Sequence, residues 1–235
     1  MAEDCRLVAG IDEAGRGPLL GPMVVTGVSL PERRLPELLH AGVRDSKDLT
    51  PQARRLLAEL IEKLSSHVVV VLVPPRLIDS VNLNELEENT IIFIIERLYS
   101  VARAGGCSLR RVYVDAVGPP ERLEKRLREA TGLEVVVSPK ADARYLPVSA
   151  ASIIAKVARD AEVEKLRRLY GVRGSGYPTD PETLEWLRVA YQRSPDKPPD
   201  YIRASWGTLR RVAPGWYRPK KRRGQRSLLD FLGPR

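Results

Sequence analysis

The sequence is poor in the residues that bind transition metals. Its 235 residues include only two cysteines, Cys5 and Cys107, and two histidines, His40 and His67. These four residues do not have the spacing of a zinc site, and an isolated thiol inside the cell usually behaves as a small buried hydrophobe. We therefore expect two separate buried thiols, and neither a zinc site nor a histidine-dependent hydrolase.

Long hydrophobic runs are also missing. No stretch approaches the roughly 20 apolar residues that span a bilayer, and residues 1–6 are too acidic for a signal peptide. Hydrophobic residues still make up 43% of the chain, which is enough for a substantial core. We expect a cytoplasmic globular monomer that does not contact a membrane.

Acidic residues are scarce in one part of the chain, residues 215–235. This segment holds seven Lys or Arg residues and one acidic residue, Asp230, while the whole chain has a net charge of +9. Such a basic run is typical of a solvated segment that binds nucleic acid or an acidic protein surface. We expect a folded domain over residues 1–214, followed by a basic tail over residues 215–235.

Hydrophobic patterning predicts the elements of an α/β domain. Short β-branched runs predict strands at residues 7–11, 23–30, 68–73, 112–115 and 134–138. Amphipathic runs predict helices at residues 51–65, 85–103, 120–130, 150–169 and 182–192. Strand, helix and strand follow one another from residue 112 to 138, which is typical of a parallel crossover, whereas the first two strands are close enough to pair antiparallel. The sheet is therefore expected to be mixed.

Acidic side chains stand where predicted strands end. Asp12 and Glu13 follow one strand, Asp115 ends another, and Asp142 lies in the loop after the next strand. If the strands are parallel neighbours, these carboxylates converge at one sheet edge and repel one another unless cations neutralise them. Oxygen ligands without His or Cys favour Mg²⁺ or Mn²⁺. The alternative is that Asp12 and Asp115 cap loops or form ion pairs.

A glycine-rich turn follows the first acidic pair. Gly15 and Gly17 flank Arg16, so the backbone can approach a ligand closely while the guanidinium meets an anion such as phosphate. The alternative is a tight turn with a solvated arginine. Next to a carboxylate cluster, a phosphate-binding turn is what phosphodiester hydrolysis requires.

These residues belong to a longer pattern that resembles ribonuclease HII. It occupies six segments in order, at residues 10–22, 45–47, 114–116, 140–142, 149–156 and 174–178. The run Gly-Tyr-Pro-Thr-Asp-Pro at residues 176–181 is similar to the archaeal branch. The resemblance implies a ribonuclease H-like mixed five-stranded sheet flanked by helices, with C-terminal helices and a basic tail.

The resemblance also implies a reaction. The family's metal-binding acids fall on Asp12, Glu13, Asp115 and Asp142, and none is substituted. They would hold two divalent ions, Mg²⁺ or Mn²⁺. The implied activity is cleavage on the 5′ side of ribonucleotides in RNA/DNA hybrids and of single ribonucleotides in duplex DNA, which leaves a 3′-hydroxyl and a 5′-phosphate.

Substrate contacts are implied as well. The Gly-Arg-Gly turn would hold the nucleotide around its ribose 2′-hydroxyl, and the tyrosine would sense that hydroxyl and pack on the following deoxyribose. Two lysines resemble positions that contact the nucleic acid backbone or the active-site acids. The implied substrate-binding residues are Gly15, Arg16, Gly17, Lys47, Ser149, Lys156 and Tyr177.

Simpler roles remain open for several of these residues. Tyr177 lies in a Gly- and Pro-rich loop, where an aromatic side chain is often simply exposed. Lys156 and Asp160 are four residues apart on a predicted helix, a spacing that also suits an ion pair. Asn82 and Asn84, near a helix start, are expected to be caps rather than ligands.

The tail carries a short motif that resembles the peptide that binds sliding clamps of the PCNA type. Its residues are Gln225, Leu228, Phe231 and Leu232. Exposed Leu and Phe in a basic tail favour partner binding, whereas the alternative is a short helix packed back on the domain.

Two rival functions stay open. One keeps the fold but prefers long RNA/DNA hybrids to single ribonucleotides. The other is a non-catalytic, clamp-associated subunit that binds nucleic acid. The intact acidic positions argue against the second rival, because a binding module would gain affinity by losing carboxylates near phosphate.

Overall fold

The computed structural model describes residues 5–43, 49–116 and 118–220. Its strands are β1 (Arg6–Ala14), β2 (Met23–Pro31), β3 (His67–Val73), β4 (Ser108–Asp115) and β5 (Val135–Ser138). Its α-helices are α1 (Leu35–His40), α2 (Pro51–Leu64), α3 (Pro75–Ser80), α4 (Leu83–Ala104), α5 (Pro120–Thr131), α6 (Leu146–Tyr170), α7 (Pro181–Arg193) and α8 (Leu209–Val212). Short 3-10 helices are η1 (Glu32–Arg34), η3 (Ala141–Ala143) and η4 (Pro214–Trp216). Every predicted strand and helix is found, whereas α1, α3 and α8 were not predicted.

The predicted mixed five-stranded sheet is confirmed. Its strand order is β3-β2-β1-β4-β5, and β4 is parallel to both β1 and β5. Helix α5 provides the crossover between β4 and β5 and is capped at its C-terminus by Gly132, whose φ of 68° is left-handed and suits glycine. This connection brings the carboxyl ends of three parallel strands to the same edge of the sheet.

The chain divides into two compact units, and some elements belong partly to each. Unit 1 comprises Met1–Ala14, Val25–Val71 and Glu87–Val157. Unit 2 comprises Gly15–Val24, Leu72–Leu86 and Ala158–Arg235.

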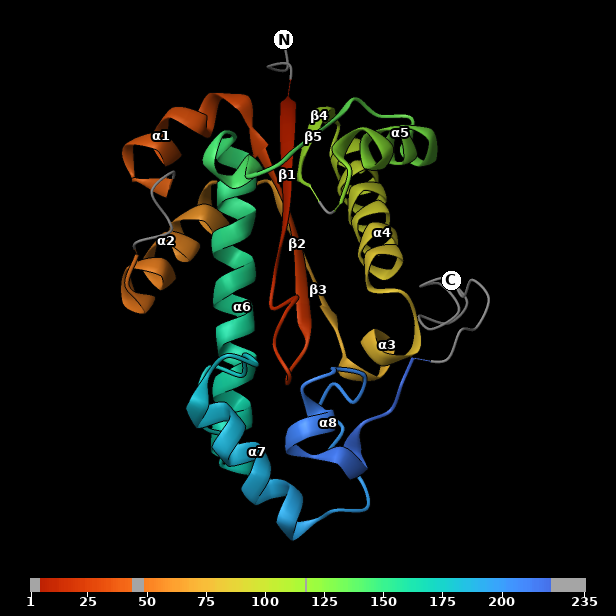
Figure 1. Ribbon diagram of the computed structural model, residues 1–235. Coiled ribbons are helices and arrows are strands. Elements are labelled where there is room, and N and C mark those ends of the chain that lie inside the picture. Colours follow the sequence, from red (N-terminus) through yellow and green to blue (C-terminus); the bar gives the residue numbers. More distant parts are fainter. Residues whose placement is uncertain (1–4, 44–48, 117, 221–235) are drawn as a thin grey trace. The chain divides into compact units, whose positions relative to one another are not determined.

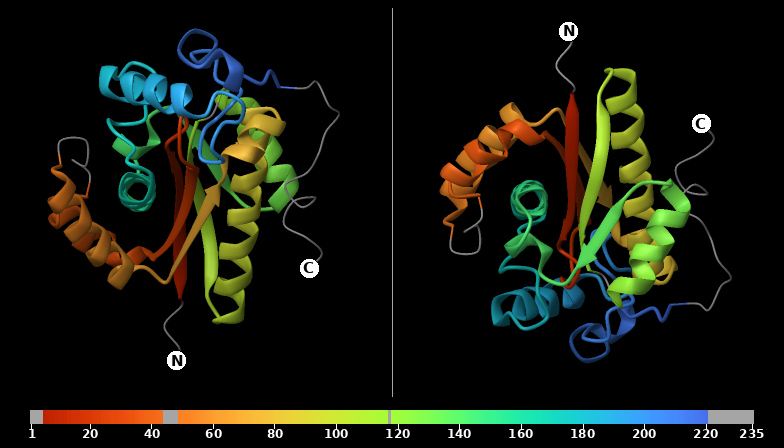
Figure 2. Two further views of the ribbon diagram at one scale, coloured as in Figure 1. Left: turned by 90° about the horizontal axis from the view of Figure 1, so that it is seen from below. Right: turned by 90° about the horizontal axis from the view of Figure 1, so that it is seen from above.

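Helices cover both faces of the sheet in unit 1. Helices α1 and α2 and the first half of α6 lie on one face, and α4 and α5 lie on the other (Figure 1 and Figure 2). Two glycines permit this close packing. A Cβ atom on Gly10 would overlap the Pro147 carbonyl group in α6, and one on Gly27 would overlap Ile94 Cγ2 in α4. Larger residues at either position would push a helix away from the sheet.

The expectation of two separate thiols is wrong. Cys5 and Cys107 form a disulfide that joins the start of β1 to the start of β4. The two residues are 102 positions apart in the sequence, so no local spacing indicated that they would meet. They do so because β1 and β4 pair in parallel register, with Arg6 opposite Ser108.

Unit 2 has a hydrophobic core of its own. It includes Leu19, Leu187 and Leu209, together with Trp216, all fully buried. The Trp216 indole donates a hydrogen bond to the Ser194 carbonyl at 2.8 Å. The packed chain thus includes Trp216, at the start of the segment expected to be a tail.

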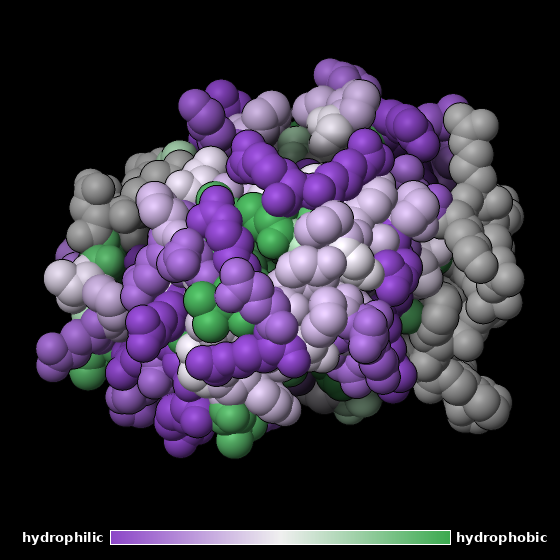
Figure 3. Space-filling view, turned by 60° about the horizontal axis from the view of Figure 1, so that its bottom comes forward, coloured by the Kyte–Doolittle hydropathy of each residue, from purple (hydrophilic) through white to green (hydrophobic). Residues whose placement is uncertain are grey.

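Across the described residues, every helix is too short or too polar to cross a membrane. The face drawn in Figure 3 is mostly hydrophilic, and hydrophobic residues form only small areas on it.

Candidate active site

The predicted convergence of Asp12 and Asp115 is present in unit 1. Strands β1 and β4 are parallel neighbours, and Ile11 lies opposite Val114. The next residues along the two strands are therefore the two aspartates. On the far side of β4, Asp115 lies opposite Ser138 of β5. The acids stand at the shared carboxyl edge, where open α/β sheets usually bind ligands.

Burial and like charges disfavour the ionised form of Asp12. Its side chain is only 7% exposed. Burial raises its pKa well above the usual value, and the neighbouring charges of Glu13 and Asp115 raise it further. Hydrogen bonds from the Ser152 side chain and the Glu13 N–H act in the opposite direction. A cation beside these carboxylates would remove the repulsion.

The loop after β5 brings Asp142 to the same edge of the sheet. Asp115 Oδ1 accepts a hydrogen bond from the Ala141 N–H at 2.6 Å, so the carboxylate is joined to the residue that precedes Asp142. Lys140 has a φ of 54°, a left-handed conformation that is costly for a residue with a Cβ atom. This turn starts η3, which carries Asp142.

The acidic side chains at this edge are of the type that binds a divalent metal, but their positions do not form a complete set of ligands among the described residues. The oxygen-only donors and the mutual repulsion at Asp12 suit Mg²⁺ or Mn²⁺. Nevertheless, within the described part of the chain, no three His, Cys, Asp or Glu side chains are placed to hold one ion. The four-carboxylate metal site therefore stays a prediction.

The Gly-Arg-Gly turn, residues 15–17, belongs to unit 2 and begins two positions after Glu13. Gly15 has a φ of 77°, so a side chain there would be strained. The Arg16 guanidinium donates a hydrogen bond to Asn84 Oδ1. Asn82 caps α4 by accepting bonds from the Asn84 and Glu85 N–H groups, as predicted, whereas the Asn84 side chain instead contacts Arg16.

Tyr177 lies against this turn. A Cβ atom on Gly17 would be 3.6 Å from Tyr177 Cε1, an ordinary contact distance. The two segments are also joined through their backbones, because the Leu19 N–H donates to the Gly176 carbonyl at 2.7 Å. The structure thus brings together two implied substrate-binding segments that are about 160 residues apart in the sequence.

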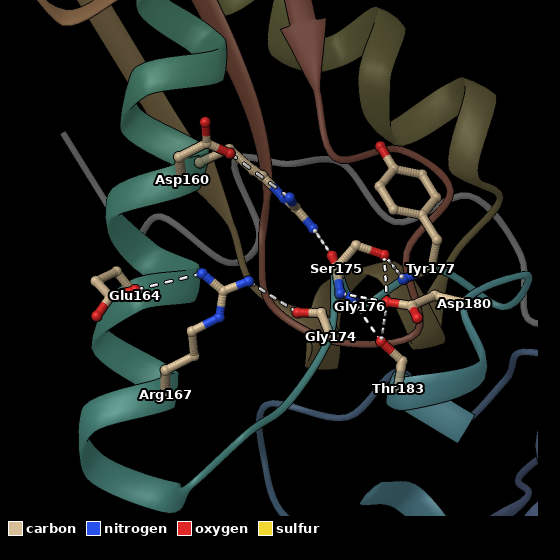
Figure 4. Close-up of polar contacts among 10 residues, drawn as sticks. Asp160, Glu164, Arg167, Gly174, Ser175, Gly176, Tyr177, Asp180 and Thr183 are labelled. Carbon is tan, nitrogen blue, oxygen red and sulfur yellow. Dashed lines mark hydrogen bonds and ion pairs between the residues drawn. The ribbon is translucent and has the colours of Figure 1, made fainter. Parts of the chain in front are cut away.

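Asp180 holds the loop that carries Tyr177 (Figure 4). Its carboxylate accepts hydrogen bonds from the Ser175 N–H, from Ser175 Oγ at 2.7 Å and from Thr183 Oγ1 at 2.9 Å. It also accepts a bond from the Glu182 N–H at 3.0 Å, which caps α7. These donors lower the pKa of Asp180 far below its usual value, with the Ser175 bonds as the largest cause. An Asp directly before a Pro is a helix-start signal that sequence analysis can recognise.

The other implied substrate residues have different surroundings. Ser149 is fully buried, and its hydroxyl donates to the Val43 carbonyl at 2.6 Å, so it has no surface with which to meet substrate. Ser152, one turn further along α6, is the serine that reaches Asp12. Lys156 is half-buried, and its predicted role is untested. Lys47 and the clamp motif Gln225, Leu228, Phe231 and Leu232 lie outside the described residues.

Arg203, whose side chain is fully buried, was not predicted from the sequence as a functional residue. It donates hydrogen bonds to the carbonyl groups of Gly15 at 2.5 Å, Arg16 at 2.8 Å and Gly21 at 3.0 Å. The only sequence signal was an arginine between the apolar residues Ile202 and Ala204. That signal alone does not indicate which backbone the arginine contacts.

Comparisons with known proteins agree with this arrangement. A sequence model of the family described as Ribonuclease HII matches residues 9–209. The chain belongs to the ribonuclease HII family. It is 54% identical to the ribonuclease HII of Hyperthermus butylicus, with 97% of this chain and 95% of the relative covered. It is 45% identical to the enzyme of Aeropyrum pernix, with 97% and 99% covered. As predicted, the chain is a nuclease, a hydrolase of phosphodiester bonds.

Solved structures of ribonuclease HII proteins share the fold. The crystal structure of ribonuclease H2 from Pyrococcus horikoshii matches with a TM-score of 0.80 and 39% identity, covering 89% of this chain and 98% of that one. A ribonuclease HII from Archaeoglobus fulgidus, solved in complex with PCNA, matches with a TM-score of 0.74 and 41% identity, covering 85% and 95%.

Proposed function

We propose that this chain cleaves the phosphodiester on the 5′ side of ribonucleotides, in RNA/DNA hybrids and at single ribonucleotides embedded in duplex DNA. The products are a 3′-hydroxyl and a 5′-phosphate. The observation that carries this proposal is the buried Asp12 beside Glu13 and Asp115, followed after Ala14 by the Gly-Arg-Gly turn. A protein that needed no cation there would gain stability by replacing these carboxylates.

We propose that Asp12, Glu13, Asp115 and Asp142 hold two divalent ions, Mg²⁺ or Mn²⁺. Ribonuclease HII proteins depend on divalent metals, and the four carboxylates supply the hard oxygen ligands that such ions prefer. Two bound ions in a phosphodiesterase activate water and stabilise the leaving oxygen. The chain contributes by holding Asp12 with Ser152 and Asp115 with the Ala141 N–H, so that the acids stay at the strand ends.

Ribose recognition is assigned to the Gly-Arg-Gly turn and to Tyr177. The ring packs against Gly17, so a nucleotide on the turn also meets the tyrosine. The 2′-hydroxyl is the group that separates RNA from DNA, and it is a small acceptor and donor that backbone N–H and phenol groups can bind. Lys47, Lys156 and Arg16 would add positive charge for the phosphates.

The clamp partner is a separate part of the proposal. The Archaeoglobus fulgidus relative was solved as a complex with PCNA. This chain carries the clamp-like motif Gln225, Leu228, Phe231 and Leu232 near its C-terminus. We propose that this motif binds a PCNA-type sliding clamp, and that the protein acts as a monomer in the cytoplasm.

A cleavage assay tests the catalytic proposal and its rivals. Labelled duplexes with one ribonucleotide, with an all-RNA strand or with no ribonucleotide are incubated with Mg²⁺, Mn²⁺ or EDTA, and the cut is mapped. We expect cleavage 5′ of the single ribonucleotide with metal and none in EDTA. Cleavage of only the all-RNA strand would support the rival specificity for long hybrids, and no cleavage of any duplex would support the non-catalytic binding subunit.

A further inference from the structure

Arg203 binds the Gly-Arg-Gly turn from inside unit 2. Its Nη2 and Nη1 atoms donate to the carbonyl groups of Gly15 and Arg16, at 2.5 and 2.8 Å, and its Nε atom donates to the Gly21 carbonyl at 3.0 Å. The three bonds involve all three nitrogen atoms of the guanidinium, a rigid and planar group. One side chain therefore fixes both ends of the loop from residue 15 to 21.

Trp206 continues this set of contacts. Its indole N–H donates to the Gly17 carbonyl at 2.9 Å, so the carbonyl groups of residues 15, 16 and 17 are all bound by the segment 203–206. The Arg203 guanidinium lies over the Trp206 ring, with Cζ 5.1 Å from the ring centre. Arg203 and Trp206 thus act on three successive residues of the turn.

The segment 203–206 is itself anchored. The Asp79 carboxylate accepts hydrogen bonds from the Ala204 N–H at 2.8 Å, from the Ser205 N–H at 2.9 Å and from Ser205 Oγ at 2.6 Å. Charge-assisted bonds to a carboxylate are stronger than neutral ones. Asp79 lies at the end of α3, so the support of the turn is built on a helix.

The direction of these carbonyl groups determines where the turn presents its N–H groups. The described peptide bonds are all trans, and in a planar trans peptide the N–H points opposite to the C=O. The Gly15 and Arg16 carbonyl groups point toward Arg203. The N–H groups of Arg16 and Gly17 belong to the same two peptide units and therefore point away from Arg203, to the other side of the turn.

Burying this arginine is costly. Burial, together with the nearby charge of Arg159, lowers the pKa of Arg203 to about 9. The guanidinium is still charged at neutral pH, so the fold places a cation where water does not reach it. The three carbonyl bonds offset that cost only while the turn keeps this conformation.

We propose that Arg203 and Trp206 are positioning residues for substrate selection: they orient the Gly-Arg-Gly turn so that the N–H groups of Arg16 and Gly17 face the ribose 2′-hydroxyl oxygen. This inference rests on the proposed function, because it assigns the turn to ribose recognition. It adds that discrimination between ribose and deoxyribose depends on two residues that need not touch the nucleic acid.

Matched variants test the proposal. Arg203→Lys keeps the charge but loses the fork, and Trp206→Phe keeps an aromatic ring but loses the N–H donor. Arg210→Lys is the control for the first, because Arg210 bonds to the Tyr217 hydroxyl at 2.7 Å and not to the turn. Trp216→Phe is the control for the second, because its indole bonds to the Ser194 carbonyl. Leu209→Ala controls for lost stability, since Leu209 is fully buried in the core of unit 2.

Two measurements are made on each folded variant. The first is the amide NMR spectrum of the free ¹⁵N-labelled protein, which reports the turn without any substrate. The second is the ratio of Kd values, in EDTA, for two duplexes that differ only in one ribonucleotide. We expect the Arg16 and Gly17 amide signals to shift or broaden in Arg203→Lys and Trp206→Phe. We also expect their preference for the ribonucleotide duplex to fall about tenfold, equivalent to about 1.4 kcal/mol.

The outcomes separate this inference from the proposed function. If wild-type protein does not prefer the ribonucleotide duplex, the assignment of ribose recognition fails. If wild type shows the preference but both variants retain it, or if the three control variants lose it equally, the inference is overturned. If Arg203→Lys does not fold, the result for Trp206→Phe alone decides whether the inference stands.

Discussion

The Arg159 guanidinium lies over the Tyr177 ring, with Cζ 5.5 Å from the ring centre, and donates a hydrogen bond to the Ser175 carbonyl at 2.8 Å. One side chain therefore contacts both the ring and the loop that carries it. A cation over an aromatic face is attractive, so the ring is held in place although it is 39% exposed.

Tyr177→Ala should slow cleavage at a single embedded ribonucleotide more than cleavage inside a long RNA strand, by about tenfold in relative kcat/KM, or about 1.4 kcal/mol. The proposed contact requires a deoxyribose after the ribose, which long RNA does not offer. Tyr170→Ala, which removes another exposed tyrosine, is the control. Equal losses on both substrates would assign Tyr177 to catalysis or folding in general.

Asp12→Asn and Asp115→Asn should each reduce cleavage in Mg²⁺ by at least about 100-fold, or about 2.7 kcal/mol of transition-state stabilisation. Each substitution removes a proposed metal ligand. Duplex binding should persist, because both changes lower the negative charge near phosphate. Single-turnover rates and Kd values measure this, with the exposed Asp196→Asn as control. Wild-type rates in either variant would contradict the two-metal proposal.

Asp180→Ala should lower the free energy of unfolding at pH 7 by about 1 kcal/mol, the usual cost of losing a helix N-cap. The folded pKa of Asp180 is depressed, so its ionised form contributes stability above the unfolded value of about 3.9 and loses that contribution as the pH falls below it. The difference from wild type should therefore shrink below about pH 4. Urea unfolding across this pH range measures the difference, and a pH-independent difference would contradict the assignment.

Reduction of the disulfide between Cys5 and Cys107 should lower the melting temperature. A crosslink that closes a loop of about 100 residues stabilises a fold by about 4.7 kcal/mol in the chain-entropy estimate. Differential scanning calorimetry with and without dithiothreitol measures the effect. The double variant Cys5→Ser with Cys107→Ser should melt at the lower temperature under both conditions. A melting temperature that dithiothreitol leaves unchanged in wild type would show that the bond does not form in solution.

Phe231→Ala with Leu232→Ala should abolish binding to the cognate sliding clamp while leaving cleavage of a short duplex intact. The pair removes the apolar anchors and keeps every tail charge, so the salt dependence of duplex binding should not change. Removal of residues 221–235 retains the contacts of Lys220 with Trp206 and Val81. Unlike the double variant, this truncation should flatten the salt dependence of duplex binding. The slope of log K against log salt concentration should fall by about 0.9 for each phosphate that the shortened chain no longer binds. Clamp binding by the double variant would contradict the peptide assignment.

The fold and the acidic end of the sheet followed from local patterns. Alternation and β-branched runs predicted the strands, and the strand-helix-strand order over residues 112–138 predicted that β4 and β5 are parallel. The meeting of Asp12 with Asp115 was predicted only on the condition that β1 and β4 are parallel neighbours, and the tertiary structure supplied that pairing. The sequence did not indicate whether Ser149 or Ser152 contacts Asp12. The two serines lie one turn apart on α6, and the rotation of that helix about its axis decides that Ser152 does so.

The sequence alone determined which residues we propose for the chemistry, because their types, order and spacing along the chain match a family pattern. Only the tertiary structure decided what holds them. Arg203 and Gly15 are 188 positions apart, and the disulfide joins residues 102 positions apart. The first contact depends on how the chain packs around a buried charge, and the second depends on which strands pair and in which register. A hydrophobic pattern with a period of two or 3.6 residues contains no information about either.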